Sequence, residues 1–361
     1  MTPYGVCSDV HLHKWSAFST TLTTGVNSRL QEILNELLRC AQTTVDAGGD
    51  TMIITGDLFH VRGSVAPSVL NPALTVFNQI VNGMGLNLIV LAGNHDLESK
   101  NSDELTNACE ALRGIHPDKV TVVSKPMLDM DNKRLFMPWF DDQSELMKSI
   151  ENHINIIDMN DLDVSEFSLF IHAPMNEVIP GLPDHGIDPD ELSAFGFEYV
   201  FCGHYHNHKE VRANVFSVGA LTHQTWGDVN ARAGFMVVSE FSVDFYPSEA
   251  PKFINYNDHD PKDDTEAFEL CNGNYVKIKI ASATQTEVQD MRNHLISVCG
   301  AKAAVVEAQP ASKVVTRTAA TTESVKLRDS IHGFIKGRTM TADPKVVMAE
   351  CDDILTQVGG A

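Results

Sequence analysis

The stretch that decides the fold of this chain reads Leu88-Ile89-Val90-Leu91-Ala92-Gly93-Asn94-His95-Asp96. It begins as a short apolar run, which is typical of a buried strand. It ends in an amide, an imidazole and a carboxylate, all of which can bind metal ions. Gly93, between the two parts, permits a tight turn. The stretch therefore predicts a strand whose carboxyl end carries metal-binding residues.

Four other short apolar runs end in the same way. They read Val6-Cys7-Ser8-Asp9-Val10-His11, Met52-Ile53-Ile54-Thr55-Gly56-Asp57, Leu169-Phe170-Ile171-His172 and Tyr199-Val200-Phe201-Cys202-Gly203-His204-Tyr205-His206. In layered α/β proteins, ligands collect just beyond the carboxyl ends of the strands. One such end could be chance, but five ends that carry Asp, His and Asn predict a single metal site.

Helical patterns separate the first strands. Apolar residues at helical spacing occur over 30–41 and again over 69–81. The alternation of strands and helices implies right-handed crossovers and a largely parallel sheet. Strand-like runs at 216–219 and 234–238 are expected to complete a second sheet that packs on the first.

The last third of the chain has a different organisation. The polar, Pro-containing stretch 248–264 is expected to be a linker. A strand–helix–strand pattern follows over 276–306. A Thr/Ala-rich segment, 316–322, then leads to two amphipathic helices at 327–335 and 343–358. These helices either cover the open face of the strand–helix–strand unit or bind an external partner.

The charge of the chain limits its partners. The 361 residues carry a net charge of −21, which counts against indiscriminate binding of a polyanion such as DNA. Residues 311–361 hold seven basic and six acidic side chains, whereas the rest hold 20 and 42. If a phosphate backbone is bound, local basic strips and metal cations must hold it.

Cysteine spacing and hydropathy indicate an intracellular protein. The seven cysteines never occur as CxxC pairs, which argues against a disulfide framework and a structural zinc site. We expect reduced, buried thiols. No apolar run reaches the ~18 residues of a membrane span, and the first strand leaves no room for a signal peptide. We therefore expect a cytoplasmic location and no membrane partner.

The five motifs together resemble the calcineurin-like metallophosphoesterase superfamily. They match its pattern in order across roughly the first 210 residues. The resemblance implies two divalent cations that share the Asp57 carboxylate. The first cation would be held by Asp9, His11, Asp57 and His206, and the second by Asp57, Asn94, His172 and His204. Imidazole and oxygen ligands suit Mn, Fe or Zn better than Ca or Mg. We expect two divalent ions, Mn first, with Mg, Fe and Zn as the alternatives. Two such cations ~3.5–4 Å apart can clamp both oxygens of a displacement at phosphorus.

The resemblance also implies roles for three residues that are not metal ligands. His95 would orient the scissile phosphate or protonate the leaving oxygen. Asp96 would fix the tautomer of His95 by accepting a hydrogen bond from its ring. His60 would orient the substrate, although a loop histidine packed on its own helix fits the same position.

A longer match narrows the family. Gly56-Asp57-Leu58-Phe59-His60, followed by Pro67-Ser68, resembles the SbcD family of double-strand-break repair nucleases, and the compact chain resembles its virus-encoded members. This resemblance implies an α/β fold, a four-layer metallophosphoesterase β-sandwich flanked by helices, with a small α+β capping domain and C-terminal helices. The expected domains are a nuclease domain at 1–255, a DNA-capping domain at 265–310, and a linker with helices for docking an SbcC-type ATPase at 311–361. DNA, that ATPase and a second copy of the chain are the expected partners.

Three functions are compatible with these features. The first is a two-metal DNA nuclease, exonucleolytic on duplex ends and endonucleolytic on single strands, that acts with the ATPase in DNA repair, recombination or replication. The second is a phosphatase or small-substrate phosphodiesterase on the same scaffold. The third is a non-catalytic scaffold subunit that binds DNA and the ATPase. The intact ligand set disfavours the third, and the additional C-terminal 100 or so residues disfavour the second.

Overall fold

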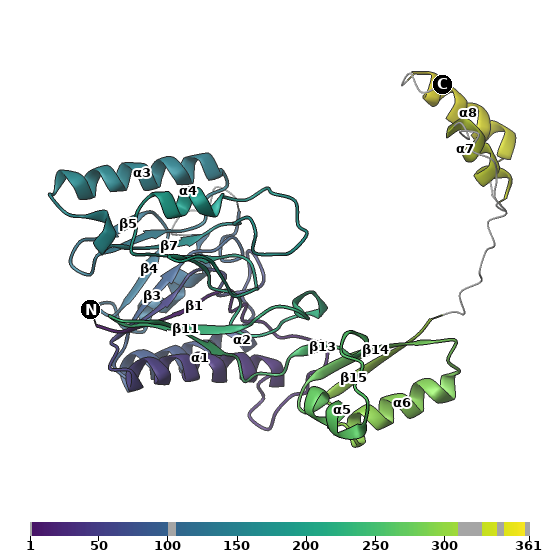
Figure 1. The fold of residues 1–361 in the computed structure, drawn as a ribbon, viewed down its shortest axis with the longest axis horizontal. Coiled ribbons are helices and arrows are strands. Elements are labelled where there is room, and N and C mark those ends of the chain that lie inside the picture. Colours follow the sequence, from purple (N-terminus) through teal and green to yellow (C-terminus); the bar gives the residue numbers. More distant parts are fainter. Residues whose placement is uncertain (1, 100–105, 310–326, 338–342, 358–361) are drawn as a thin grey trace. The chain divides into compact units, whose positions relative to one another are not determined.

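The computed structural model describes residues 2–99, 106–309, 327–337 and 343–357. The chain forms two compact units, Met1–Pro310 and Ala311–Ala361, which are described separately (Figure 1). Two six-stranded sheets and one three-stranded sheet build the first unit. The described residues of the second unit form two helices.

The first sheet has the strand order β12-β11-β1-β2-β3-β4. Its strands are β1 (Tyr4–Cys7), β2 (Thr51–Ile54), β3 (Asn87–Leu91), β4 (Val120–Val123), β11 (Gly234–Val238) and β12 (Val243–Pro247). Strands β1 to β4 are parallel, and β11 runs antiparallel to β1. The crossovers are α1 (Ser28–Asp46), α2 (Pro67–Asn78), which continues as a π-helical turn over Gln79–Gly83, and a 3-10 segment at Ala108–Gly114. The predicted parallel core is confirmed.

The second sheet has the order β5-β6-β7-β8-β10-β9. Its strands are β5 (Met127–Asp129), β6 (Arg134–Met137), β7 (Ser168–His172), β8 (Tyr199–Gly203), β9 (Lys209–Arg212) and β10 (Val215–Ser217). The helices α3 (Gln143–Met159) and α4 (Pro189–Ala194) pack against it. In Figure 1, α3 and α1 lie on opposite sides of the pair of sheets.

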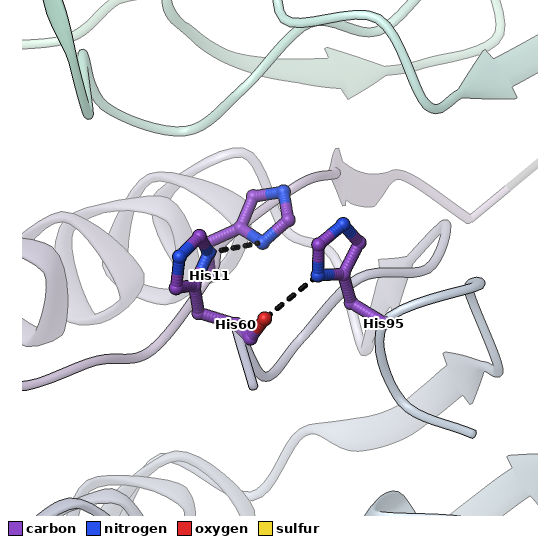
Figure 2. A group of neighbouring side chains, drawn as sticks. All are labelled: His11, His60 and His95. Atoms are coloured by element: carbon purple, nitrogen blue, oxygen red, sulfur yellow. Dashed lines mark hydrogen bonds between the residues drawn. The ribbon is translucent and has the colours of Figure 1, made fainter. Parts of the chain in front are cut away.

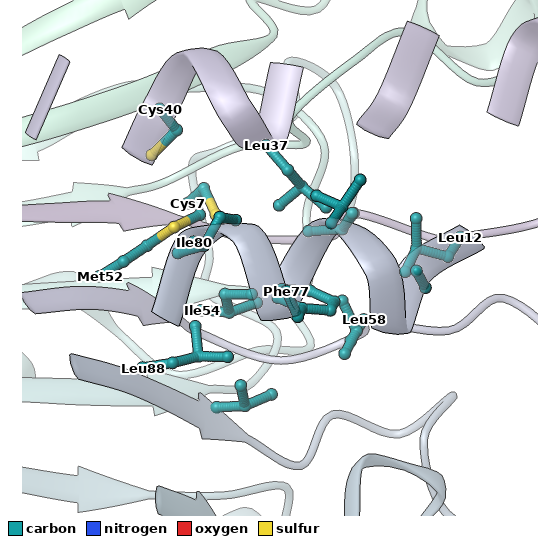
Figure 3. Packing of buried hydrophobic residues seen from close by; sticks show 14 of the residues in the cluster. Cys7, Leu12, Leu37, Cys40, Met52, Ile54, Leu58, Phe77, Ile80 and Leu88 are labelled. Atoms are coloured by element: carbon teal, nitrogen blue, oxygen red, sulfur yellow. The ribbon is translucent and has the colours of Figure 1, made fainter. Parts of the chain in front are cut away.

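Three apolar clusters create four layers. One joins the outer face of the first sheet to α1 and α2, through residues such as Leu37, Ile54 and Phe77 (Figure 3). A second joins the second sheet to α3 and α4. The third lies between the sheets, where the Phe170 ring stacks on Phe136 and Phe201. The predicted four-layer α/β sandwich is thus confirmed.

One strand joins a different sheet from the one expected. Residues 234–238, expected in the second sheet, form β11 beside β1 in the first sheet. All five residues of β11 are buried, because Phe235 faces the helix-side core and Met236 faces the core between the sheets. The local pattern identifies a strand, but its partner depends on which apolar faces the tertiary fold brings together.

The three-stranded sheet is built from β13 (Phe253–Asn255), β14 (Tyr275–Ala281) and β15 (Ala303–Gln309), all parallel. The helix α6 (Gln285–Ser297) is the expected crossover, and α5 (Asp264–Cys271) precedes β14. Strand β13 lies inside 248–264, the stretch expected to be a linker. The hydroxyl of Tyr275 donates to Glu32 on α1, and Lys302 forms an ion pair with the same carboxylate. The small sheet is therefore bound directly to α1.

The second unit contains α7 (Leu327–Lys336) and α8 (Pro344–Gln357), close to the predicted boundaries; the predicted end at residue 358 lies outside the described residues. The two helices pack together, because His332 Nε2 lies 3.0 Å from Asp352 Oδ1 and Arg328 pairs with the same carboxylate. Among the described residues, no helix is both long and apolar enough to cross a membrane. All seven cysteines are free thiols, and six of them are buried, as predicted.

Candidate metal centre

The strand ends that carry the predicted ligands come from both large sheets. Asp9, Asp57 and Asn94 follow β1, β2 and β3 of the first sheet, whereas His172 ends β7 and His204 follows β8 of the second. The amide N–H of His204 donates to Asp9 Oδ2 at 3.0 Å, which joins the two edges. The site therefore lies where the carboxyl ends of two packed sheets meet.

The first predicted ligand set is assembled in the structure. Asp9, His11 and His206 form a group whose ligand atoms lie within 4.8 Å of one another. The Nε2 atoms of His11 and His206 are 3.3 Å apart, and His11 Nε2 lies 3.7 Å from Asp57 Oδ2. Four side chains from three strand ends thus surround one small volume.

The second predicted set is also assembled. Asn94 Oδ1 lies 3.2 Å from His172 Nε2 and 3.1 Å from His204 Nδ1. Asp57 Oδ1 lies 3.4 Å from His172 Nε2. Because Asp57 also lies beside His11, its carboxylate is shared by both sets, which is the bridging position that the resemblance implies.

The donor atoms fit cations. Within the described residues, the buried Asp9 Oδ1 has no hydrogen-bond partner, while Asp9 Oδ2 accepts from the hydroxyl of Ser8 and the amide of His204. The His172 Nδ1–H donates to the carbonyl of Thr55 at 2.7 Å, so in the neutral ring Nε2 carries a lone pair that faces two oxygens. Acceptors that face one another in a buried site require a cation or a proton between them.

The electrostatics agree with this arrangement. Burial lowers the pKa of His11 to about 3 and that of His204 to about 4, which keeps both rings in the neutral form that binds metals. Burial opposes a charge on His172, but Asp57 outweighs it and raises the pKa of His172 to about 9. A cation at the second set would therefore displace a proton.

The backbone at these positions is strained. Asp9, His11, Asp57 and His204 have positive φ angles of 47°, 46°, 52° and 106°. Non-glycine residues rarely adopt this region, and such strain gathers at functional sites. Two glycines permit this backbone path for different reasons. Gly56 has a positive φ of 102°, which a glycine adopts easily. A Cβ on Gly93 would lie 2.2 Å from the amide nitrogen of Asp57. The glycine before Asn94 is thus required for close approach.

The structure places His95 and His60 together beside His11 (Figure 2). The His95 Nδ1–H donates to the carbonyl of His60 at 2.7 Å, and the two rings stack with centroids 5.6 Å apart. His60 Nδ1 lies 3.3 Å from His11 Nδ1. The backbone N–H of His95 donates to Asp57 Oδ1 at 2.8 Å. His60 is thus part of the site and holds His95 through its main chain.

The role predicted for Asp96 requires correction. Its carboxylate accepts three backbone N–H groups, those of Leu58, Phe59 and Gly93, at 2.8–3.2 Å. The ring of His95 is oriented by the carbonyl of His60 instead. Asp96 therefore ties the loop after β2 to the loop after β3, because a buried carboxylate is satisfied by the nearest amide donors.

Sequence reasoning missed several residues that contact the ligands. Asp228 Oδ1 lies 2.8 Å from His206 Nδ1, the Gln224 side chain donates to the carbonyl of Asp9, and the Trp139 ring stacks on His204. These residues carry no motif of their own. Among the histidines near the motifs, His13 lies against His60, whereas His223 accepts from the amide of Phe253 and anchors β13.

The sandwich thus carries two sets of metal-binding side chains that share the Asp57 carboxylate. The profile of the family described as calcineurin-like phosphoesterase matches residues 2–208. The chain therefore belongs to the calcineurin-like phosphoesterase family, whose members use a dinuclear metal site.

The chain is also similar to individual proteins. The chain is 29% identical over 192 residues to exonuclease subunit 1 of Enterobacteria phage T4. That match covers 52% of each protein, so the chain spans about half the length of the curated relative. Similar solved structures include a dimetal phosphatase from Danio rerio, with 9% identity and a TM-score of 0.42 over 65% of this chain and 91% of that one. A nuclease from Pseudomonas putida has 15% identity and a TM-score of 0.31, over 68% and 84%.

Proposed function

We propose that this protein is a two-metal DNA nuclease that cuts duplex ends exonucleolytically and single strands endonucleolytically. We further propose that it is the nuclease subunit of an SbcC-type ATPase complex in DNA repair, recombination or replication. The observation that carries the proposal is the position of Asp57, which lies 3.7 Å from His11 and 3.4 Å from His172. The relative named exonuclease subunit 1 supports a nuclease over a phosphatase.

The residues that would hold the two cations are those of the two sets. Asp9, His11, Asp57 and His206 would bind the first, and Asp57, Asn94, His172 and His204 the second; we propose Mn at both. When bound, such cations activate water and neutralise charge that develops on the phosphate. The seven side chains include only two carboxylates, so a net positive charge of about +2 would remain to attract the anionic substrate.

The proposed acid is His95. Its Nδ1–H is held by the carbonyl of His60, so Nε2 is the ring nitrogen that can meet the leaving oxygen. In the imidazolium form this nitrogen would donate the proton that the departing sugar hydroxyl requires. His60, stacked on His95, would keep the ring in place and orient the phosphate.

The small sheet supports a DNA-binding role. Lys277 on β14 lies over the ring of Trp226, with 4.9 Å between the ammonium nitrogen and the ring centroid. A cation beside an aromatic ring is a common platform for nucleic acids, and the Trp226 ring is partly exposed. We propose that 265–310, with β13 added, caps DNA on the nuclease domain of 1–255.

The terminal helices support an ATPase partner. Ile335 and Leu355 are buried within the α7–α8 pair, whereas Val346 and Ile354 are 63% and 56% exposed. An apolar helix face in water favours a partner that covers it, such as a coiled coil. We therefore propose that 311–361 docks the ATPase, that the complex contains two copies of this chain, and that it acts in the cytoplasm.

The test uses the full-length protein with Mn, a labelled linear duplex and p-nitrophenyl phosphate, with and without a co-encoded ATPase. We expect Mn-dependent shortening of the duplex from its ends, a much slower release of p-nitrophenol, and faster cutting with the ATPase. Hydrolysis of p-nitrophenyl phosphate with an intact duplex would favour the small-substrate enzyme. Sedimentation with and without the ATPase measures how many copies of each protein the complex contains.

A further inference from the structure

A buried carboxylate lies behind one of the candidate metal ligands. Asp228 ends the short 3-10 turn Trp226–Asp228, and its Oδ1 lies 2.8 Å from His206 Nδ1. The other nitrogen of the same ring, Nε2, lies 3.3 Å from His11 Nε2 in the first ligand set. The two nitrogens of His206 therefore face different partners.

The carboxylate is held in place from its other side. Asp228 Oδ2 accepts the backbone N–H groups of Gln224 at 2.9 Å and Thr225 at 2.8 Å. The same segment is anchored at Gln224, because the Gln224 side chain donates to the carbonyl of Asp9 and Arg29 donates to the carbonyl of Gln224. Asp228 cannot rotate without breaking these bonds.

From this geometry we propose that Asp228 is a positioning residue that fixes the tautomer of His206. An ionised carboxylate only accepts hydrogen bonds, so the ring proton must reside on Nδ1. Nε2 then keeps its lone pair for the first cation. The inference rests on the metal site of the proposed function, but it does not depend on the substrate.

An amide at this position would reverse the arrangement. In Asp228→Asn, the single amide oxygen is needed by the two backbone N–H groups of Gln224 and Thr225. The NH2 group would then face His206 Nδ1 and donate to it. The ring proton would move to Nε2, the nitrogen that must bind the cation. Carboxylates behind metal-binding histidines commonly contribute 10–100-fold in metal affinity, so we expect a loss of that order at one of two sites.

The first measurement needs no metal and no substrate. Long-range 1H–15N correlation spectra of the metal-free protein report which ring nitrogen of His206 carries the proton. At an alkaline pH at which the ring is neutral, we expect Nδ1–H in the wild type and Nε2–H in Asp228→Asn. A neutral wild-type ring that carries its proton on Nε2 overturns the proposal without any variant.

Calorimetric Mn titration supplies the second measurement. We expect one of two binding steps to weaken about 10–100-fold in Asp228→Asn. Thr225→Ser is the matched control, because it changes a residue of the same turn but keeps the hydroxyl that caps it and leaves the Asp228 carboxylate in place. Equal weakening in both variants, or unchanged Mn affinity in Asp228→Asn, would contradict the proposal. Neither measurement uses DNA, so both would give the same result if the protein did not cut DNA.

Discussion

Replacement of His95 by Asn separates catalysis from metal binding. The Asn side-chain NH2 can take the place of Nδ1 and donate to the carbonyl of His60, which the imidazole contacts at 2.7 Å. The backbone N–H that donates to Asp57 Oδ1 at 2.8 Å is unchanged. The substitution therefore removes one group from the site, the ring nitrogen Nε2.

The magnitude follows from the role of that nitrogen. A positioned acid contributes about 10²- to 10⁴-fold in rate, and each factor of ten corresponds to about 1.4 kcal/mol of activation free energy. We expect kcat for Mn-dependent hydrolysis of a labelled linear duplex to fall by that range, which corresponds to roughly 3–6 kcal/mol. Mn affinity should change less than threefold.

The assay compares His95→Asn with His259→Asn, a substitution of an exposed histidine. Steady-state kinetics gives kcat, and calorimetry gives the Mn stoichiometry and affinity. A His95→Asn enzyme with wild-type kcat would refute the assignment of the acid. A loss of Mn affinity equal to the loss of rate would instead identify His95 as a ligand, in the His11–His60–His95 group.

Three other perturbations test the site and the core. Asp57→Asn should weaken both Mn binding steps more than tenfold in calorimetry, because its carboxylate lies in both ligand sets; the loss of a single step would disprove the bridging position. Phe170→Ala should lower the free energy of unfolding in urea by about 3–5 kcal/mol, because its ring stacks on two others between the sheets. Phe241→Ala, at a side chain that is 90% exposed, should have almost no effect. Burial lowers the pKa of His208 in the folded protein to about 4. As the pH falls, His208 is therefore protonated in the unfolded chain before it is protonated in the folded one, and the free energy of unfolding decreases between about pH 6.5 and pH 4. Between pH 7 and pH 5, the metal-free His208→Gln variant should therefore lose about 2 kcal/mol less free energy of unfolding than the metal-free wild type. Identical pH profiles for the two proteins would contradict the buried neutral ring.

Much of the fold could be predicted because its signals are local. The apolar runs that became β1, β2, β3, β7 and β8 are recognised from their own residues, and so are the helical patterns of α1 and α6. The partner of β11 could not be predicted in this way. Its residues indicate only that both faces of the strand are apolar. The sheet that the strand joins depends on the free edge beside β1.

The sequence by itself determined which side chains could bind cations, because ligand chemistry resides in the residue and the strand ends position it. Only the tertiary structure decided which neighbours orient those side chains. Asp96, adjacent to His95 in the chain, bonds to backbone amides, whereas Asp228, 22 residues beyond His206, bonds to its ring. Hydrogen bonds form between groups that folding brings within about 3 Å, and separation along the chain does not reveal which groups these are.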